Sequence, residues 1–405
     1  MNMFWKNYGS LLFVFACLPI LVPAQNPGPI NPGGLDPALI NRATMGDPAA
    51  EFLVATAYRN GQGVAKDQAM SASWLRKAAE QGIPNAQYDL GLCYELGQGV
   101  AKDEKQAIVW YERAASQGNS DAMRALGILY SEGRGVLKDA RQAFELFSQA
   151  ASLGDPYSQL QIGIDFEDGR EVAKDEKQAA LWYRKAAEQG NAQAQYNLGV
   201  QNQDGKGVPQ DYPQAAEWFR KSANQGYSAA EFSLGLCYVH GKGVPQDYVQ
   251  ALSWYRKAAE QNFPAALVNL ALLYFEGKGV AADEKQAFSY IRQAAEAGAV
   301  DAQFQLGMDY DGGYHGLKQD KTLAIEWFRR AAEQGYAPAE FDLAMEIHEQ
   351  NDETYFWLSL AVPELQGDFQ KKAAYFRDVA AAALTAAQRA KLDARVKDWR
   401  AAHPK

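Results

Sequence analysis

The chain has 405 residues and a composition typical of a folded protein, with 47% hydrophobic and 22% charged residues. Forty Lys and Arg residues stand against 49 Asp and Glu residues, for a formal net charge of −9. Nucleic acids and anionic membranes attract clustered basic side chains, so this acidic balance argues against either as a partner.

The N-terminus has the pattern of a secretory signal peptide over residues 1–24. Lys6 precedes an apolar run over residues 11–22, and small residues follow it near Ala24. We expect cleavage after Ala24 and a periplasmic or secreted protein. A stable membrane span is not expected, because about a dozen apolar residues are fewer than the ~20 that a span needs. A lipoprotein attached at Cys17 is the less favoured alternative.

A period of 36 residues organises the chain from residue 47 to residue 335. The stretch GKGVPQDY at 205–212 returns at 241–248, and Gly-x-Gly pairs recur at the same interval. Each period predicts two helices, the first ended by a glycine and the second opened by an aspartate. A Pro- and Gly-rich lead and a short cap helix precede the array over residues 25–46. The eight predicted units are 47–82, 83–118, 119–154, 155–190, 191–226, 227–262, 263–298 and 299–335.

Tryptophan marks one place in the second helix of most units. Around Trp110, apolar residues spaced three and four apart form one wide stripe that alternates large and small side chains. A single hairpin cannot bury such a stripe, so neighbouring hairpins must stack. We therefore expect a structural role for Trp74, Trp110, Trp182, Trp218, Trp254 and Trp327.

The repeated run AxYxLGxxYexGxGVxxDxxxAxxWyrkAAeqG resembles the Sel-one-like repeat (SLR) family, a relative of the tetratricopeptide repeats. Residues 86–118 and 194–226 show the motif most completely. The resemblance implies an all-α fold, a right-handed αα superhelix of about eight helix-turn-helix repeats whose first helices line a concave face. It also implies an adaptor in protein complexes, which in bacteria is often exported and serves envelope, signalling or host-interaction roles.

The last 70 residues, 336–405, read as a half repeat followed by a C-terminal helical cap. The Gly-x-Gly loop is missing after Gln350, and two further helices are predicted over 368–384 and 385–402. Thr385 and Gln388 have the spacing of a capping box. We expect these end helices to be more polar than the repeats, since a polar end stops further stacking.

No constellation of catalytic or metal-binding residues is present in the sequence. The four histidines are scattered, and the GKGV turn lacks the glycine spacing and the Ser or Thr of a phosphate loop. We therefore predict no enzyme, no catalytic residue, no metal and no cofactor. A β-lactamase-like hydrolase is a remote alternative, because the relatives with that association carry two cysteines per repeat. Here only Cys93 and Cys237 follow the predicted cleavage site.

The sequence also indicates where a partner binds, if the first helices line a groove. Residues three, seven and ten after the small residue that opens each first helix should then point into it. We expect a polar, acid-leaning groove that receives a protein or peptide, although the same residues would also suit plain solvated helix faces. A regulator or inhibitor of an envelope enzyme is the alternative function, and a monomer is expected. The candidates are Gln161, Asp165, Asp168, Asn197, Gln201, Asp204, Gln305 and Asp309.

Overall fold

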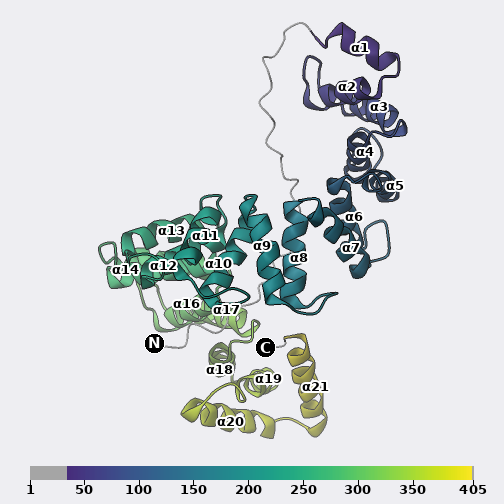
Figure 1. Cartoon of the computed structure of the whole chain (residues 1–405). Coiled ribbons are helices and arrows are strands. Elements are labelled where there is room, and N and C mark those ends of the chain that lie inside the picture. The colour runs from purple at the N-terminus through teal and green to yellow at the C-terminus, as the bar shows by residue number, and fades with distance from the viewer. Residues whose placement is uncertain (1–33, 404–405) are drawn as a thin grey trace. The chain divides into compact units, whose positions relative to one another are not determined.

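The computed structural model describes residues 34–403, where all the regular structure is α-helical (Figure 1). The predicted signal peptide and the alternative attachment site at Cys17 lie outside the described residues. The chain divides into two compact units, and the boundary falls between Leu146 and Phe147. We call them the N-terminal and C-terminal units and describe each by itself.

Helix-turn-helix repeats make up both units, as the sequence predicts. The first helices are α2 (Pro48–Asn60), α4 (Pro84–Leu96), α6 (Ser120–Glu132), α8 (Pro156–Asp168), α10 (Ala192–Asp204), α12 (Ser228–His240), α14 (Pro264–Glu276), α16 (Val300–Gly312) and α18 (Ala337–Glu346). The second helices are α3 (Gln68–Glu80), α5 (Glu104–Ala115), α7 (Ala140–Ser152), α9 (Glu176–Glu188), α11 (Tyr212–Ala223), α13 (Tyr248–Glu260), α15 (Glu284–Glu296), α17 (Lys321–Ala332) and α19 (Asn351–Ala361). The expected all-α repeat fold is confirmed.

Three helices lie outside this alternation. They are α1 (Pro37–Thr44), which precedes the first repeat, and α20 (Gly367–Ala382) and α21 (Ala386–Ala402), which end the chain. Inside each unit the two helices of a repeat pack together, as α4 does with α5 and α8 with α9, and the second helix then packs on the first helix of the next repeat, as α3 does on α4 and α9 on α10. Each such interface buries small and large apolar side chains in a cluster, such as Tyr183, Ala194 and Leu198. The array therefore has the nearest-neighbour architecture of a solenoid.

Aspartates cap the second helices where the sequence places them. The Asp175 side chain accepts hydrogen bonds from the backbone N–H groups of Lys177 and Gln178. Such a cap stabilises a helix by about 1 kcal/mol relative to alanine. At Thr385 the capping box is complete, because Gln388 also accepts a bond from the Thr385 backbone N–H.

The Gly-x-Gly loop is needed for two different reasons. Gly205 ends α10 in the left-handed conformation, with φ of 71°. Gly207 lies so close to the preceding repeat that a Cβ there would be 2.0 Å from the carbonyl oxygen of Glu176. A side chain at that place would force the repeats apart. In the fourth repeat Glu171 occupies the second place and adopts φ of 54°.

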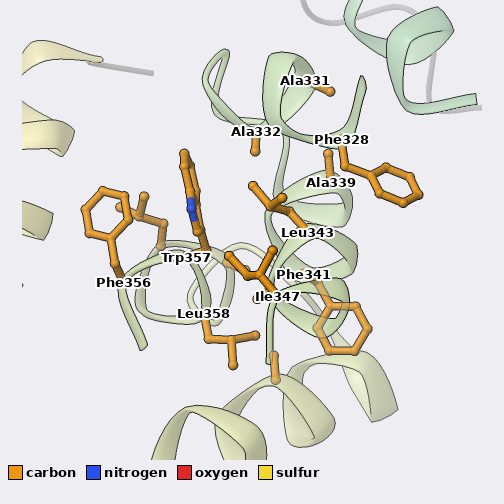
Figure 2. Close-up of a cluster of buried hydrophobic side chains, with 14 of the residues drawn as sticks. Phe328, Ala331, Ala332, Ala339, Phe341, Leu343, Ile347, Phe356, Trp357 and Leu358 are labelled. Carbon is orange, nitrogen blue, oxygen red and sulfur yellow. The ribbon is translucent and has the colours of Figure 1, made fainter. Parts of the chain in front are cut away.

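The C-terminal core continues the repeat pattern without the loop. Figure 2 shows Leu343 and Ile347 on the side of α18 that faces Trp357 and Leu358 of α19. Trp357 follows Trp327 by 30 residues instead of 36, which is the length of a repeat without the Gly-x-Gly turn. It is buried against Phe356, and their rings are 5.0 Å apart.

The cap helix α20 differs from the sequence prediction of a polar end. Its inner side buries Ala373 and Ala380, but large apolar side chains also line an outer side. The exposed residues are Phe369, Tyr375, Phe376 and Val379. The expectation of a polar end came from the need to stop further stacking, and α20 does not meet it on this outer side.

Candidate partner-binding face

The exposed side of the first helices is defined by counting from the small residue that opens each one, for example Ala194 in α10. Residues at positions three, six and ten after it fall within about 60° of one another on a helix of 100° per residue. In α10 these are Asn197, Val200 and Asp204, which are half-buried or exposed. We call this side the first-helix face.

From the second repeat onward, position six of the first helices in each unit is apolar, and we call these residues the apolar column of that unit's first-helix face. Every repeat from the second onward places an aliphatic or methionine side chain there, and each one is half-buried or exposed. Leu272 is the most exposed, at 46%. The column consists of Leu92 and Ile128 in the N-terminal unit and of Ile164, Val200, Leu236, Leu272, Met308 and Met345 in the C-terminal unit.

The sequence analysis did not identify this column. Its signal was nevertheless present, because one position stays apolar in eight successive copies while its neighbours at positions three and ten vary. Regular apolar residues are ordinarily assigned to the core, and the 36-residue register alone does not separate position six from position seven. The helical geometry does separate them.

Position seven lies in the core, which corrects two of the predicted binding residues. Gln201 is 1% exposed and Asp309 is fully buried, so neither side chain faces a groove. Seven residues make almost two helical turns, which returns the chain to the side of the buried opening alanine. Other repeats fill the place with small or apolar residues: Ala57, Cys93, Leu129, Cys237 and Leu273.

The remaining candidates do lie at the surface, although two are already paired. Asp168 and Asp204 are exposed, and each carboxylate forms an ion pair with a loop cation two residues on, Arg170 at 2.7 Å and Lys206 at 3.0 Å. Exposed pairs of this kind contribute little stability. The other three predicted surface residues are Gln161 and Asn197, both half-buried, and Gln305, which is exposed.

Asp165 differs from these acids because it has no cation of its own. The side chain is half-buried in α8, and burial raises the pKa of its carboxyl to about 6, although Arg170 acts against this. Asp342 in α18 is similar. Burial, together with the nearby Asp311 and Glu346 carboxylates, raises its pKa to about 6. Carboxyl groups whose pKa is shifted in this way are frequent at functional sites.

Asp309 is held by a small polar network in the eighth repeat. Its Oδ1 atom accepts a hydrogen bond from Gln305 and lies 3.0 Å from Nδ1 of His315. The His315 ring stacks on Phe288 with the centroids 5.3 Å apart. Burial raises the pKa of the Asp309 carboxyl above its usual range. His315 lies in the loop between α16 and α17, so this network joins that loop to α16 and its role in the fold is structural.

The tryptophans lie at the interfaces between repeats. Trp218 and Trp254 each pack on a hydrophobic cluster that includes residues of the preceding repeat. A Lys or Arg three residues later covers the ring, as Lys185 does over Trp182 at 3.7 Å. Such cation–π contacts stabilise exposed sites by roughly 0.5–1 kcal/mol. The same arrangement occurs at Trp74, Trp110, Trp218, Trp254 and Trp327.

The described residues contain no group of three or more His, Cys, Asp or Glu side chains placed to hold a metal ion. Cys93 and Cys237 are both buried free thiols, and burial raises the pKa of each to about 11. Across residues 34–403, no helix is long and apolar enough to cross a membrane.

Comparison with known proteins identifies the family. The Sel1 repeat matches eight consecutive segments: 48–83, 84–119, 120–155, 156–191, 192–227, 228–263, 264–298 and 300–336. The chain belongs to the Sel1-repeat family, as the resemblance in the sequence predicts. Proteins of this family generally mediate protein–protein interactions, and their solenoid is typically a non-catalytic binding scaffold.

Two solved structures are similar over most of their length. The protein c5321 of uropathogenic Escherichia coli, described as a protective antigen with an SLR fold, is 31% identical with a TM-score of 0.59. That match covers 89% of this chain and 86% of the other. A Sel1 repeat protein from Oxalobacter formigenes is 32% identical with a TM-score of 0.58, over 75% of this chain and 87% of the other. No curated protein matches the chain.

Proposed function

We propose that this protein is an exported scaffold that binds a protein or peptide partner on its first-helix face. The observation that carries the proposal is the apolar column. Leu272 and Met308 are exposed in two adjacent repeats, and the same position is apolar in the repeats next to them. Apolar side chains that recur at one exposed or half-buried place on a folded protein suit an interaction site.

The polar residues beside the column fit the same use. Gln161 and Asn197 lie at position three, where they can give direction to a partner whose apolar side chains contact the column. Gln305 has the same position in the eighth repeat, but its amide already donates to Asp309. Interfaces of this type combine an apolar centre with a polar rim. No catalytic role is proposed, since the function needs surface rather than a reacting group.

Export is part of the proposal and rests on the N-terminal sequence. The order of Lys6, an apolar run and small residues near Ala24 is that of a cleaved signal peptide. The similar E. coli protein is described as a protective antigen, which is consistent with an exported protein. N-terminal sequencing of the mature protein should begin at Gln25; a chain that keeps Met1 would contradict export by this route.

Site-specific photo-crosslinking in the native cell tests the binding face. A benzophenone amino acid replaces Leu272 on the first helix α14, or, as the control, Val249 on the second helix α13, where the side chain is 61% exposed. We expect a discrete crosslinked partner from position 272 and none from position 249. Crosslinking to the same partner from position 249 alone would assign binding to the other face.

A further inference from the structure

Repeats seven and eight expose four large apolar side chains on the first-helix face or at its edge. They are Leu272 and Phe275 in α14, Met308 in α16 and Tyr314 in the loop after α16, and they are 38–57% exposed. Helices α14 and α16 contribute to one hydrophobic cluster, so they are neighbouring first helices of the C-terminal unit. We call these four residues the apolar patch.

One end of the apolar patch is a contact between α14 and the loop after α16. Leu272 and Phe275 are three residues apart and therefore lie on one side of α14. The centroid of the Phe275 ring is 6.3 Å from that of the His315 ring, and His315 directly follows Tyr314. The loop of the eighth repeat thus reaches the exposed side of the seventh repeat.

The other end of the apolar patch is the C-terminal turn of α16. A Cβ at Gly312 would be 2.0 Å from the Tyr314 ring, so this ring occupies the place where a side chain would otherwise stand. Gly312 is four residues after Met308 and lies on the same side of the helix. Tyr314 therefore fills position ten of the eighth repeat, beside Met308, and the four apolar side chains belong to one surface.

Acidic side chains border the apolar patch toward α18. Asp311 is half-buried and follows Met308 by three residues. Burial raises the pKa of the Asp342 carboxyl in α18 to about 6, and the nearby Asp311 and Glu346 carboxylates add to this effect. The ammonium of Lys321 pairs with Glu346 at 3.1 Å. In the part of the chain that the structure describes, Asp311 and Asp342 form no ion pair of their own.

We propose that this surface binds a partner segment in which Leu or aromatic side chains stand next to Lys or Arg. The apolar side chains would cover the apolar patch, and the basic one would lie between Asp311 and Asp342. A cation there would relieve the repulsion between the two carboxylates and form charge-assisted hydrogen bonds, which are the stronger kind. An acidic segment would be repelled. The inference rests on the proposed function and adds the chemistry of the partner.

Selection of phage-displayed peptides on the purified protein tests this chemistry. A library of random peptides is first depleted on the variant Leu272→Gln with Met308→Gln, which lacks much of the apolar patch, and is then selected on the unchanged protein. We expect the recovered peptides to be rich in Leu or aromatic residues beside Lys or Arg, and poor in Asp and Glu. Recovered peptides without basic residues, or failure to recover any, would overturn the inference.

Synthetic copies of the recovered peptides test the acidic border in a matched pair of variants. Asp311→Asn with Asp342→Asn should weaken binding about tenfold or more and remove most of its salt dependence, because hydrogen bonds to two charged groups are lost. Glu188→Gln with Glu260→Gln removes two exposed carboxylates from the second helices α9 and α13 and should leave the affinity unchanged. Thermal melting shows that each variant is folded. Undiminished affinity in the first pair would reject the proposed role of the two carboxylates.

Crosslinking in the cell distinguishes this inference from the proposed function. With the benzophenone amino acid at position 272, Asp311→Asn with Asp342→Asn should lower the yield of the crosslinked partner. An unchanged yield would leave the proposed function in place and reject the basic segment. Absence of any crosslink from position 272 in the otherwise unchanged protein would reject both.

Discussion

The side-chain amide of Gln189 donates a hydrogen bond of 2.8 Å to the side-chain oxygen of Gln159, 30 residues earlier. Gln159 in turn donates to the backbone oxygen of Ala151. The first bond links the end of one second helix to the buried side of the first helix of the same repeat. The pair recurs as Gln81–Glu51, Gln117–Gln87, Gln225–Gln195, Gln261–Glu231 and Gln334–Gln303.

Replacing one member of this hydrogen-bonded pair should lower the unfolding free energy more than replacing both. In the seventh repeat the two places hold Leu267 and Ala297, so the fold accepts an apolar pair. Gln189→Ala alone leaves the Gln159 oxygen buried without this donor and should lower the unfolding free energy by about 1–3 kcal/mol. Adding Gln159→Leu should recover part of that loss. A urea denaturation cycle measures the coupling, and simple additivity would contradict the account.

The tyrosines of the second helices provide a matched comparison. Tyr183 donates through Oη to a Glu167 carboxylate oxygen, whereas Tyr255 is buried with no partner for its hydroxyl because Val239 stands where the glutamate would be. Tyr183→Phe should lower the unfolding free energy by about 1–2 kcal/mol, because a charge-assisted hydrogen bond is lost. Tyr255→Phe should be neutral or stabilising. Equal losses in the two variants would show that the hydroxyl contacts do not decide stability.

Glycine inside the first helices makes room for a ring. A Cβ at Gly199 would lie 2.6 Å from the Phe219 ring. Where the ring is replaced by Ile291, the glycine is replaced by Ala271. We expect Gly199→Ala to lower the melting temperature despite alanine's higher helix propensity, and Phe219→Ile to rescue it. A stabilised Gly199→Ala variant would contradict the packing seen here.

The raised pKa values of Asp165 and Asp342 predict how stability depends on pH. Both folded-state pKa values are about 6, above the ordinary value of 3.8, so the folded protein holds these protons more tightly than the unfolded chain. Stability should therefore fall as the pH rises from about 4 through 6. Asp165→Asn with Asp342→Asn should raise the melting temperature at pH 7 and flatten this slope. Asp398→Asn, at an exposed residue of α21 that does not act on either carboxyl, is the control, and an unchanged slope in the double variant would refute the assignment.

The fold was predictable because the turns need glycine and the helix starts need a capping residue. Glycines such as Gly205 and Gly207 and caps such as Asp175 have few substitutes, so their 36-residue spacing fixes the repeats. The binding face was only partly predictable. Position seven was assigned to the groove because it lies off the predicted packing stripe and varies between repeats, yet almost two helical turns return it toward the core, where Gln201 is buried.

Long-range partners were the part that sequence reasoning missed. Gln189 and Gln159 are polar residues on exposed-looking helices, and only their joint replacement by apolar residues in other repeats indicates a contact. The apolar column was overlooked for the converse reason, since Leu272 and Met308 resemble core residues until the neighbouring helices are in place. One sequence with eight copies contains both signals, provided that equivalent positions are compared across the copies.

Affinity for the crosslinked partner, measured on purified variants of unchanged melting temperature, tests the central claim most directly. Leu272→Gln with Met308→Gln removes the most exposed part of the column, and Val249→Gln with Leu181→Gln makes the same change on two second helices. We expect the first pair to weaken binding tenfold or more and the second pair to leave the dissociation constant unchanged. Intact binding in the first pair, or an equal loss in the second, would contradict binding on the first-helix face.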